Sequence, residues 1–256
     1  MKLIKPLLAA CAVLLSLSAQ AGQITVATAA DLKFAMDEIM AAFKKANPAD
    51  DVQAIYGSSG KFHTQIQQGA PYDLYFSADI AFPRELVKAG FAASDVKPYA
   101  FGRVVLWSTS MDASQVTLAG LTDPKIARIA IANPKHAPYG KRAVEALKAA
   151  GVWAKVEPKL VYGENVAQTA QFVQTGNAQA GIIALSLALN SELAKRGSYW
   201  LIPDTLHEPL EQGFVITKRA EGNALAQRFA DYMGSPPARA VMTKYGFVLP
   251  GEAAGK

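Results

Sequence analysis

The chain repeats a pattern in which a short apolar run precedes a small polar loop and then apolar residues at helical spacing. Residues 23–29 (QITVATA) form the first apolar run, and the apolar positions within residues 32–43 fall on one helical face. Asp31, between the two, is predicted to cap the helix. Strands that alternate with helices in this way predict an α/β fold with layered, largely parallel sheets.

The same reading predicts the other elements. Strands are expected at residues 52–56, 73–76, 103–108, 126–132, 160–162, 181–185, 199–202 and 213–217. Helices are expected at residues 61–68, after Tyr139-Gly140, after Asn165, at residues 224–233 with Asn223 as cap, and at residues 237–244 with Ser235 as cap. The predicted elements fall into two strand–helix series. Connecting segments near Lys97-Pro98 and within residues 203–213 mark the boundaries between them. In such folds, ligands bind beyond the carboxyl ends of the strands, where helices begin.

Residues 1–21 have the three parts of a secretory signal peptide. Lys2 and Lys5 precede an apolar run, and the run leads to Ala-Gln-Ala. The run is too short for a transmembrane helix. Cys11 stands in a segment like a lipoprotein box, but it lies inside the apolar run, so cleavage after Ala21 is favoured. We therefore expect export to the periplasm.

Composition narrows the class of protein. The 256 residues are 51% hydrophobic and 18% charged, which is ordinary for a globular chain and unlike a disordered one. Removal of residues 1–21 from the 256 leaves 235 residues, no cysteine, and a net charge of +3 in place of +5. The absence of cysteine excludes a disulfide scaffold, an iron–sulfur protein and a cysteine zinc site. The basic balance favours an anionic partner.

Signals for catalysis and for nucleic-acid binding are weak. His63, His136 and His207 have no zinc-ligand spacing, and each is expected to be an exposed or capping side chain. The chain has no G-x-S-x-G, P-loop or G-x-G-x-x-G motif. Lys44-Lys45 and Lys141-Arg142 are expected to be solvated helix faces rather than a nucleic-acid surface. We expect neither an enzyme nor a nucleic-acid partner.

The stronger signal is a set of junctions at which a loop enters a helix. These junctions are Ala30-Asp31, Ser58-Ser59-Gly60, Pro138-Tyr139-Gly140 and Asn165-Val166. Helix N-termini carry partial positive charge and free N–H donors, so they bind anions without Lys or Arg. Ordinary capping explains any one junction. Several that converge would hold a small tetrahedral oxyanion.

Five ordered segments of the mature chain resemble the periplasmic molybdate-binding proteins of ABC importers, within the type II periplasmic binding proteins. The segments are Ile24 to Leu32, Tyr56 to Asp79, Ile131 to Leu147, Glu164 to Ser186 and Gly234 to Phe247. GAPYDLYFSAD and NPKHAPYG are the most specific parts, and the resemblance spans nearly all of residues 22–251.

The resemblance implies a fold of two lobes, each a mixed sheet flanked by helices, with the ligand in the cleft between them. Lobe I would comprise residues 22–99 and 211–256, and lobe II residues 100–210. The ligand would be molybdate or tungstate, held as an oxyanion with no metal-coordinating side chain and no cofactor. A monomer would deliver it to the permease of an ABC transporter in the inner membrane. A binding protein for another oxyanion, such as phosphate, arsenate or sulfate, stays open as the alternative, and an exported enzyme is the weaker one.

The resemblance also implies the residues of the site. Ser59 matches the family's ligand serine, with its hydroxyl and backbone N–H. Tyr139 matches a family position at which the ligand is bound by the backbone in some members and by a tyrosine hydroxyl in others. Val166 matches a position at which the backbone N–H binds the ligand. Ala30 and Asp31 fall where members have Ala-Ser or Thr-Asn.

Asp31 departs from the family, which has a neutral donor at that position. A carboxylate beside a dianion is repelled by several kcal/mol at low dielectric unless something compensates. Three accounts remain open. In the first account, which we favour, the Asp31 side chain turns away from the ligand and caps the helix. In the second, Asp31 is protonated in the closed cleft. In the third, Asp31 accepts a hydrogen bond from a protonated oxyanion.

Overall fold

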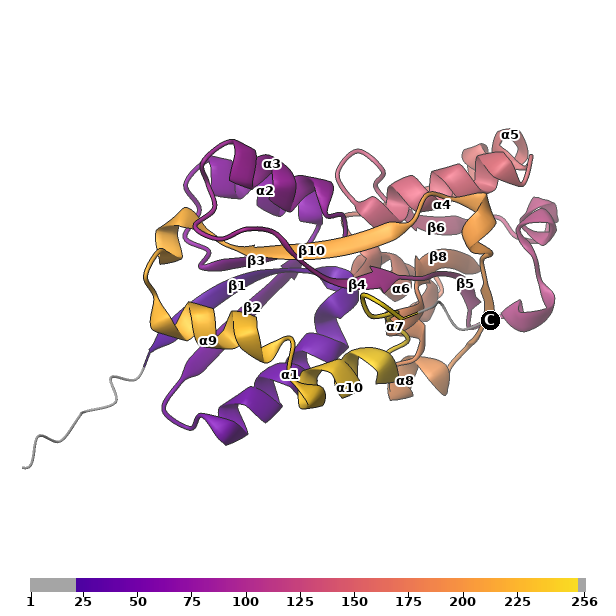
Figure 1. The fold of residues 1–256 in the computed structure, drawn as a ribbon. Coiled ribbons are helices and arrows are strands. Elements are labelled where there is room, and N and C mark those ends of the chain that lie inside the picture. The colour runs from indigo at the N-terminus through magenta and orange to yellow at the C-terminus, as the bar shows by residue number, and fades with distance from the viewer. Residues whose placement is uncertain (1–21, 253–256) are drawn as a thin grey trace, which may run out of the picture.

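The computed structural model describes residues 22–252, which form two lobes, each built on its own five-stranded sheet (Figure 1). The predicted signal peptide and its cleavage site, residues 1–21, lie outside the described residues. The sheet of lobe I has the order β2-β1-β3-β10-β4. Its strands are β1 (Gln23–Ala29), β2 (Asp51–Gly57), β3 (Leu74–Ser77), β4 (Lys97–Gly102) and β10 (Leu210–Ile216).

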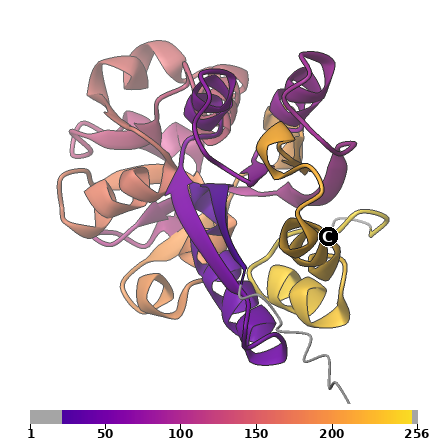
Figure 2. The same cartoon turned by 90° about the vertical axis from the view of Figure 1, so that its left-hand side faces the viewer.

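Lobe I places helices on both faces of its sheet. They are α1 (Lys33–Ala46), α2 (Ser59–Gln67), α3 (Ala81–Lys88), α9 (Ala224–Tyr232) and α10 (Pro236–Lys244). In Figure 1, α2 and α3 lie above the sheet, whereas α1, α9 and α10 lie below it. Figure 2 shows α10 beside α1 from a second direction.

The two faces of this sheet follow the alternation of side chains along each strand. Tyr75 and Val215 face the cluster under α2 and α3. Their neighbours Phe76 and Phe214 face the larger cluster with α1, α9 and α10, where the two rings stack at 4.6 Å between centroids. Both faces are therefore dry, which explains why these strands are apolar almost throughout.

Lobe II repeats the architecture with the strand order β7-β6-β8-β5-β9. Its strands are β5 (Val104–Ser108), β6 (Ile129–Ala132), β7 (Leu160–Gly163), β8 (Ala180–Ala184) and β9 (Ser198–Leu201). Its helices are α4 (Pro138–Ala149), α5 (Trp153–Val156), α6 (Val166–Gln174), α7 (Leu185–Ala188) and α8 (Ser191–Ala194). Short 3-10 turns complete the chain at Ala30–Leu32, Ala113–Gln115, Leu118–Thr122, Glu157–Lys159, Asp204–Leu206 and Lys218–Ala220.

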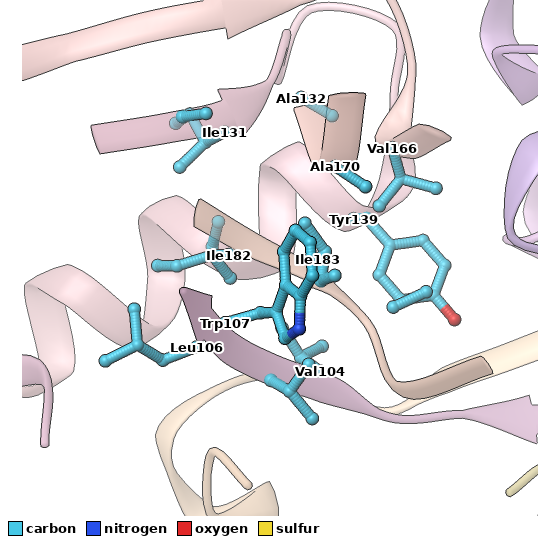
Figure 3. Close-up of a cluster of buried hydrophobic side chains, with 14 of the residues drawn as sticks. Val104, Leu106, Trp107, Ile131, Ala132, Tyr139, Val166, Ala170, Ile182 and Ile183 are labelled. Atoms are coloured by element: carbon cyan, nitrogen blue, oxygen red, sulfur yellow. The ribbon is translucent and has the colours of Figure 1, made fainter. Parts of the chain in front are cut away.

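The core of lobe II centres on Trp107, which is fully buried among β-branched and leucine side chains (Figure 3). Tyr139 and Val166 lie at the edge of this cluster, and the Tyr139 hydroxyl points away from the indole ring. The same packing that stabilises lobe II therefore also presents these two residues to lobe I.

The chain passes between the sheets twice. β4 ends at Gly102 and β5 begins at Val104, so a single residue joins the first sheet to the second. The return runs from β9, which ends at Leu201, to the start of β10 at Leu210. Both sheets combine parallel and antiparallel pairs. β1 pairs in parallel with β2 and β3, whereas β10 is antiparallel to β3 and β4.

The expected two-lobed α/β class with mixed sheets is confirmed, as are the caps Asn223 and Ser235, which accept N–H groups of α9 and α10. The strand predicted at residues 126–132 begins only at Ile129. Helix α3, interrupted in sequence by Pro83, and strand β4 escaped the pattern analysis. Across residues 22–252, no helix is long and apolar enough to cross a membrane.

The prediction that Asp31 caps the first helix is wrong. Residues Ala30–Leu32 form a 3-10 turn, Leu32 occupies the cap position of α1, and no side chain accepts a hydrogen bond there. The Asp31 side chain is buried and bonds with other elements instead, as described below. Burial among partners from distant strands and helices overrides the local capping preference.

Candidate functional site

Four of the predicted loop–helix junctions meet in one small cavity between the lobes. It is lined from lobe I by residues 29–31, 57–59 and 78, and from lobe II by residues 137–139 and 165–166. Ala30, Asp31, Ser59, Tyr139 and Val166, the five predicted site residues, therefore all line one cavity. Its volume is about 10 Å³, room for roughly one water molecule, so a larger ligand requires the lobes to move apart.

The N-terminus of α2 brings Ser59 to the cavity. Ser59 is buried, and its Oγ accepts a hydrogen bond of 3.0 Å from the backbone N–H of Ala78, at the end of β3. A hydroxyl has one proton and two lone pairs, so this contact leaves the Ser59 proton available to a ligand. Tyr75 fixes the turn from the other side by donating to the Ser59 carbonyl at 2.8 Å.

The N-terminus of α6 brings Val166 to the cavity. The Asn165 side chain accepts from the N–H groups of Ala167 and Gln168, both at 3.0 Å. These are the second and third N–H groups of the helix, and the first four have no intrahelical acceptor. The first, on Val166, is therefore left for a ligand in the cavity.

The N-terminus of α4 brings Tyr139 to the cavity. Pro138 opens the helix, where its missing N–H is not needed, and Tyr139 follows at the second position with a free N–H. The Tyr139 hydroxyl donates to Asp31 Oδ2 at 3.1 Å. Burial and the neighbouring Asp31 hold the pKa of Tyr139 well above its usual value, so the phenol stays protonated.

Asp31 is the one acidic side chain in the lining, and it is 1% exposed. Its Oδ2 accepts from Tyr139 and, at 2.7 Å, from Nε2 of Gln212 on β10. Burial raises the pKa of Asp31 to about 6, although the bonds from Gln212 and Tyr139 lower it. The carboxyl therefore changes between its acid and ionised forms near pH 6, about two pH units above an ordinary aspartate.

Gln212 is a member of the site that the sequence analysis missed. It is fully buried on β10, and its Nε2 also lies 3.4 Å from the Tyr139 hydroxyl. Gly102 on the neighbouring strand makes the space for it, because a Cβ there would collide with both the Tyr139 hydroxyl and Gln212 Nε2. The only sequence signal was a polar residue directly before the apolar run of residues 213–217.

The lobes also touch beside the cavity, through residues that the sequence analysis set aside. The His136 carbonyl accepts from Gly60 N–H at 2.9 Å and from Ser58 Oγ at 2.5 Å. Lys61 forms an ion pair with Glu164 across the same interface. His63, His136 and His207 were expected to be exposed or capping, but none of the three is exposed, and the His63 side chain is only 12% exposed. The His136 side chain, 18% exposed, lies between the lobes, and His207 is buried.

The hydrogen-bond donors around the cavity are neutral groups, and Asp31 is the one lining residue with a carboxyl, which accepts from Tyr139 and Gln212. Among residues 22–252, no group of three or more His, Cys, Asp or Glu side chains is placed to hold a metal ion. Three helix N-termini with free N–H groups and a buried serine hydroxyl instead suit a compact anion.

Comparison with known proteins assigns the chain. The family model for bacterial extracellular solute-binding proteins matches residues 24–248. The chain belongs to this family. Its curated relatives include the molybdate-binding protein ModA of Rhodobacter capsulatus, 38% identical over 237 residues, with 91% of each chain covered. ModA of Azotobacter vinelandii is also 38% identical, with 92% of this chain and 94% of the relative covered.

Two solved structures share the fold of this chain. The periplasmic molybdate-binding protein of Azotobacter vinelandii superposes with a TM-score of 0.82 at 33% identity, covering 89% of this chain and 99% of that one. The sulfate-binding protein SubI of Mycobacterium tuberculosis superposes with a TM-score of 0.73 at 17% identity, covering 90% and 87% of the chains. At that identity the second match reflects the shared fold alone.

Proposed function

We propose that this protein captures molybdate or tungstate outside the cytoplasm and delivers it to the permease of an ABC transporter in the inner membrane. The observation that carries the proposal is the convergence of the N-termini of α2, α4 and α6 on one small cavity between the lobes. The high identity to molybdate-binding relatives over nearly the whole chain supports the choice of ligand.

In this proposal the oxyanion is held by neutral groups. The Ser59 hydroxyl and backbone N–H bind from lobe I, together with the N–H of Ala30. The backbone N–H groups of Tyr139 and Val166 bind from lobe II. The Tyr139 phenol does not reach the anion, because it donates to Asp31. Fixed dipoles around a buried anion act at low dielectric, where they are stronger than in water.

Lobe closure completes the site, since lobe I offers three of these donors and lobe II the other two. We place the hinge at the two crossovers, Arg103 and the segment between β9 and β10. Closure is a rigid-body hinge motion about these short connections. The protein acts as an exported monomer after removal of residues 1–21, and it carries out no chemistry on its ligand.

The test is titration calorimetry of refolded, anion-free protein with molybdate, tungstate, sulfate and phosphate, together with metal analysis of the protein as purified. The proposal expects saturable one-to-one binding of molybdate and tungstate and weaker binding of sulfate and phosphate. Tight binding of sulfate or phosphate with no heat from molybdate would reassign the protein to another oxyanion.

Replacement of Ser59 by alanine is expected to weaken molybdate binding roughly 10- to 30-fold. The variant loses a hydrogen bond to a charged ligand, a loss of about 1.5–2 kcal/mol, and leaves the Ala78 N–H without its acceptor. The matched control is Ser191→Ala, at an exposed position on α8. Equal affinities of the two variants in calorimetry would remove Ser59 from the site.

A further inference from the structure

The hydrogen bonds around Asp31 are unequally divided between its two oxygens. Oδ2 accepts two, from Tyr139 and Gln212, while Oδ1 is buried and has no partner among the described residues. The backbone N–H groups of Asp31 and Leu32 lower the pKa of the carboxyl, yet neither makes a hydrogen bond of normal geometry to Oδ1. An ionised carboxylate would therefore leave Oδ1 poorly satisfied, which is costly in a buried site. A carboxylic acid would fit the same contacts, with Oδ2 as the carbonyl that accepts twice and Oδ1 as a hydroxyl that lacks only an acceptor.

Within residues 22–252, no Lys, Arg or His side chain bonds to the Asp31 carboxyl, and no positive charge is among the influences on its pKa. α4 presents the Tyr139 phenol, β10 presents the Gln212 amide, and Tyr99 lies near on β4. Ser186 on α7 donates at 2.7 Å to the backbone carbonyl of Asp31, not to its carboxyl. Burial is the largest influence on the pKa of Asp31, and a dianion in the cavity would favour the protonated form further.

We propose that Asp31 binds the oxyanion as a neutral carboxylic acid, with Oδ1–H donating to an anion oxygen, and that Gln212 is the positioning residue for this group. The inference rests on the proposed function, because it names the donor that replaces the neutral residue of other family members at this position. The missing partner of Oδ1 is then the ligand itself.

Anion binding is thereby coupled to proton uptake. In the anion-free protein above about pH 6 the carboxyl is largely ionised, so each bound dianion brings one proton from solvent to Oδ1. The complex forms with a change in net charge of −1 rather than −2. Affinity then falls as the pH rises above about 6 and levels off below it, because the proton is already in place there.

Gln212 determines which oxygen carries the proton. Its Nε2 donates to Oδ2 at 2.7 Å, so the proton is left to Oδ1. The amide Oε1 of Gln212 has no partner among the described residues, which leaves the orientation of the amide dependent on Asp31 and Tyr139. A side chain without a donor at position 212 would remove a bond that lowers the Asp31 pKa.

The experiment is calorimetric titration of the mature protein with sodium molybdate from pH 6.5 to 8.5, in pairs of buffers that differ in ionisation enthalpy. Wild type is expected to take up about one proton per molybdate at pH 8, and its Kd should rise roughly tenfold per pH unit. Asp31→Asn should bind with no proton uptake and with a Kd that is flat across this range. Asp95→Asn, an exposed carboxylate, is the matched control and should behave as wild type.

Gln212→Leu tests the positioning role. It should retain proton uptake, but the affinity for molybdate should begin to fall at a higher pH than in wild type. A purely structural role of Gln212 would not shift this pH.

Thermal melting supplies a readout without ligand. Because the folded pKa of Asp31 lies above the unfolded value of 3.8, its ionisation destabilises the fold as the pH rises from about 4 to above 6. Asp31→Asn should therefore melt higher than wild type at pH 8, with the difference closing towards pH 4.

Three outcomes would overturn the inference. Tight molybdate binding by wild type without proton uptake would show that Asp31 stays ionised. Proton uptake that persists in Asp31→Asn would place the proton elsewhere. If wild type prefers phosphate and Asp31→Asn prefers molybdate, Asp31 is instead an acceptor for a protonated oxyanion. Failure of molybdate and tungstate to bind at any pH would instead refute the proposed function, so the two failures are distinct.

Discussion

Replacement of Gly60 by leucine is expected to weaken molybdate binding by more than 100-fold while both lobes stay folded. A Cβ at this position would lie 2.7 Å from the His136 carbonyl oxygen, which belongs to the other lobe. That carbonyl cannot easily retreat, because Ser58 Oγ and the Gly60 N–H both bond to it. Overpacking of a rigid contact costs about 3 kcal/mol or more, and here the cost falls on the closed form alone.

The measurement is the Kd for molybdate together with the solution scattering radius before and after ligand addition. Wild type should become more compact with ligand, whereas Gly60→Leu should keep its open radius. The matched control is Gly234→Leu, since a Cβ at the exposed Gly234 has only the Asp231 carbonyl within 4 Å, at 3.5 Å. If Gly60→Leu binds and compacts like this control, the Gly60–His136 contact is not part of closure.

Replacement of Phe76 by alanine is expected to lower the free energy of unfolding by about 3–5 kcal/mol. Phe76 is fully buried at the centre of lobe I, stacked on Phe214 and edge-on to Tyr99 at 5.5 Å. Its removal leaves a cavity that β-sheet neighbours on both sides cannot close. Phe76 also precedes Ser77 and Ala78, whose N–H holds Ser59 Oγ, so binding should weaken as well.

Chemical denaturation, with the midpoint and slope fitted for each variant, measures this loss. Ile55→Ala is the control, because Ile55 is also an apolar strand residue but is 46% exposed, and it should cost well under 1 kcal/mol. Similar losses for the two variants would mean that the lobe I core tolerates the cavity. At about 2–4 °C per kcal/mol, the Phe76 variant should melt roughly 6–20 °C lower.

The sequence predicted those residues of the candidate site that lie at the starts of helices. Ser59, Tyr139 and Val166 each follow a strand and open a helix, and a local pattern of apolar spacing and small residues marks such a place. Their meeting in one cavity was not visible locally. Ser59 belongs to lobe I and the other two to lobe II, so only packing between lobes brings them together.

Asp31 shows where local reasoning failed. A carboxylate before an amphipathic segment is ordinarily a cap, and that preference is worth about 1 kcal/mol. The structure instead buries the side chain against Tyr139 and Gln212, which are 108 and 181 positions away in the chain. Bonds in a dry interior outweigh a capping bond that solvent can replace.

The sequence by itself determined the α/β class, most of the strand–helix order and the helix N-termini available for a ligand, because these depend on side-chain periodicity and on residues within a few positions of each other. The two-lobed arrangement was expected from the family resemblance and not from periodicity. Only the tertiary structure decided what those ends face. The contact of His136 with Gly60 and the burial of Asp31 against Tyr139 and Gln212 arise where the two lobes meet. Local spacing does not predict this contact, because its free energy depends on which surfaces of the two lobes are brought together by the crossovers, Arg103 and the segment between β9 and β10.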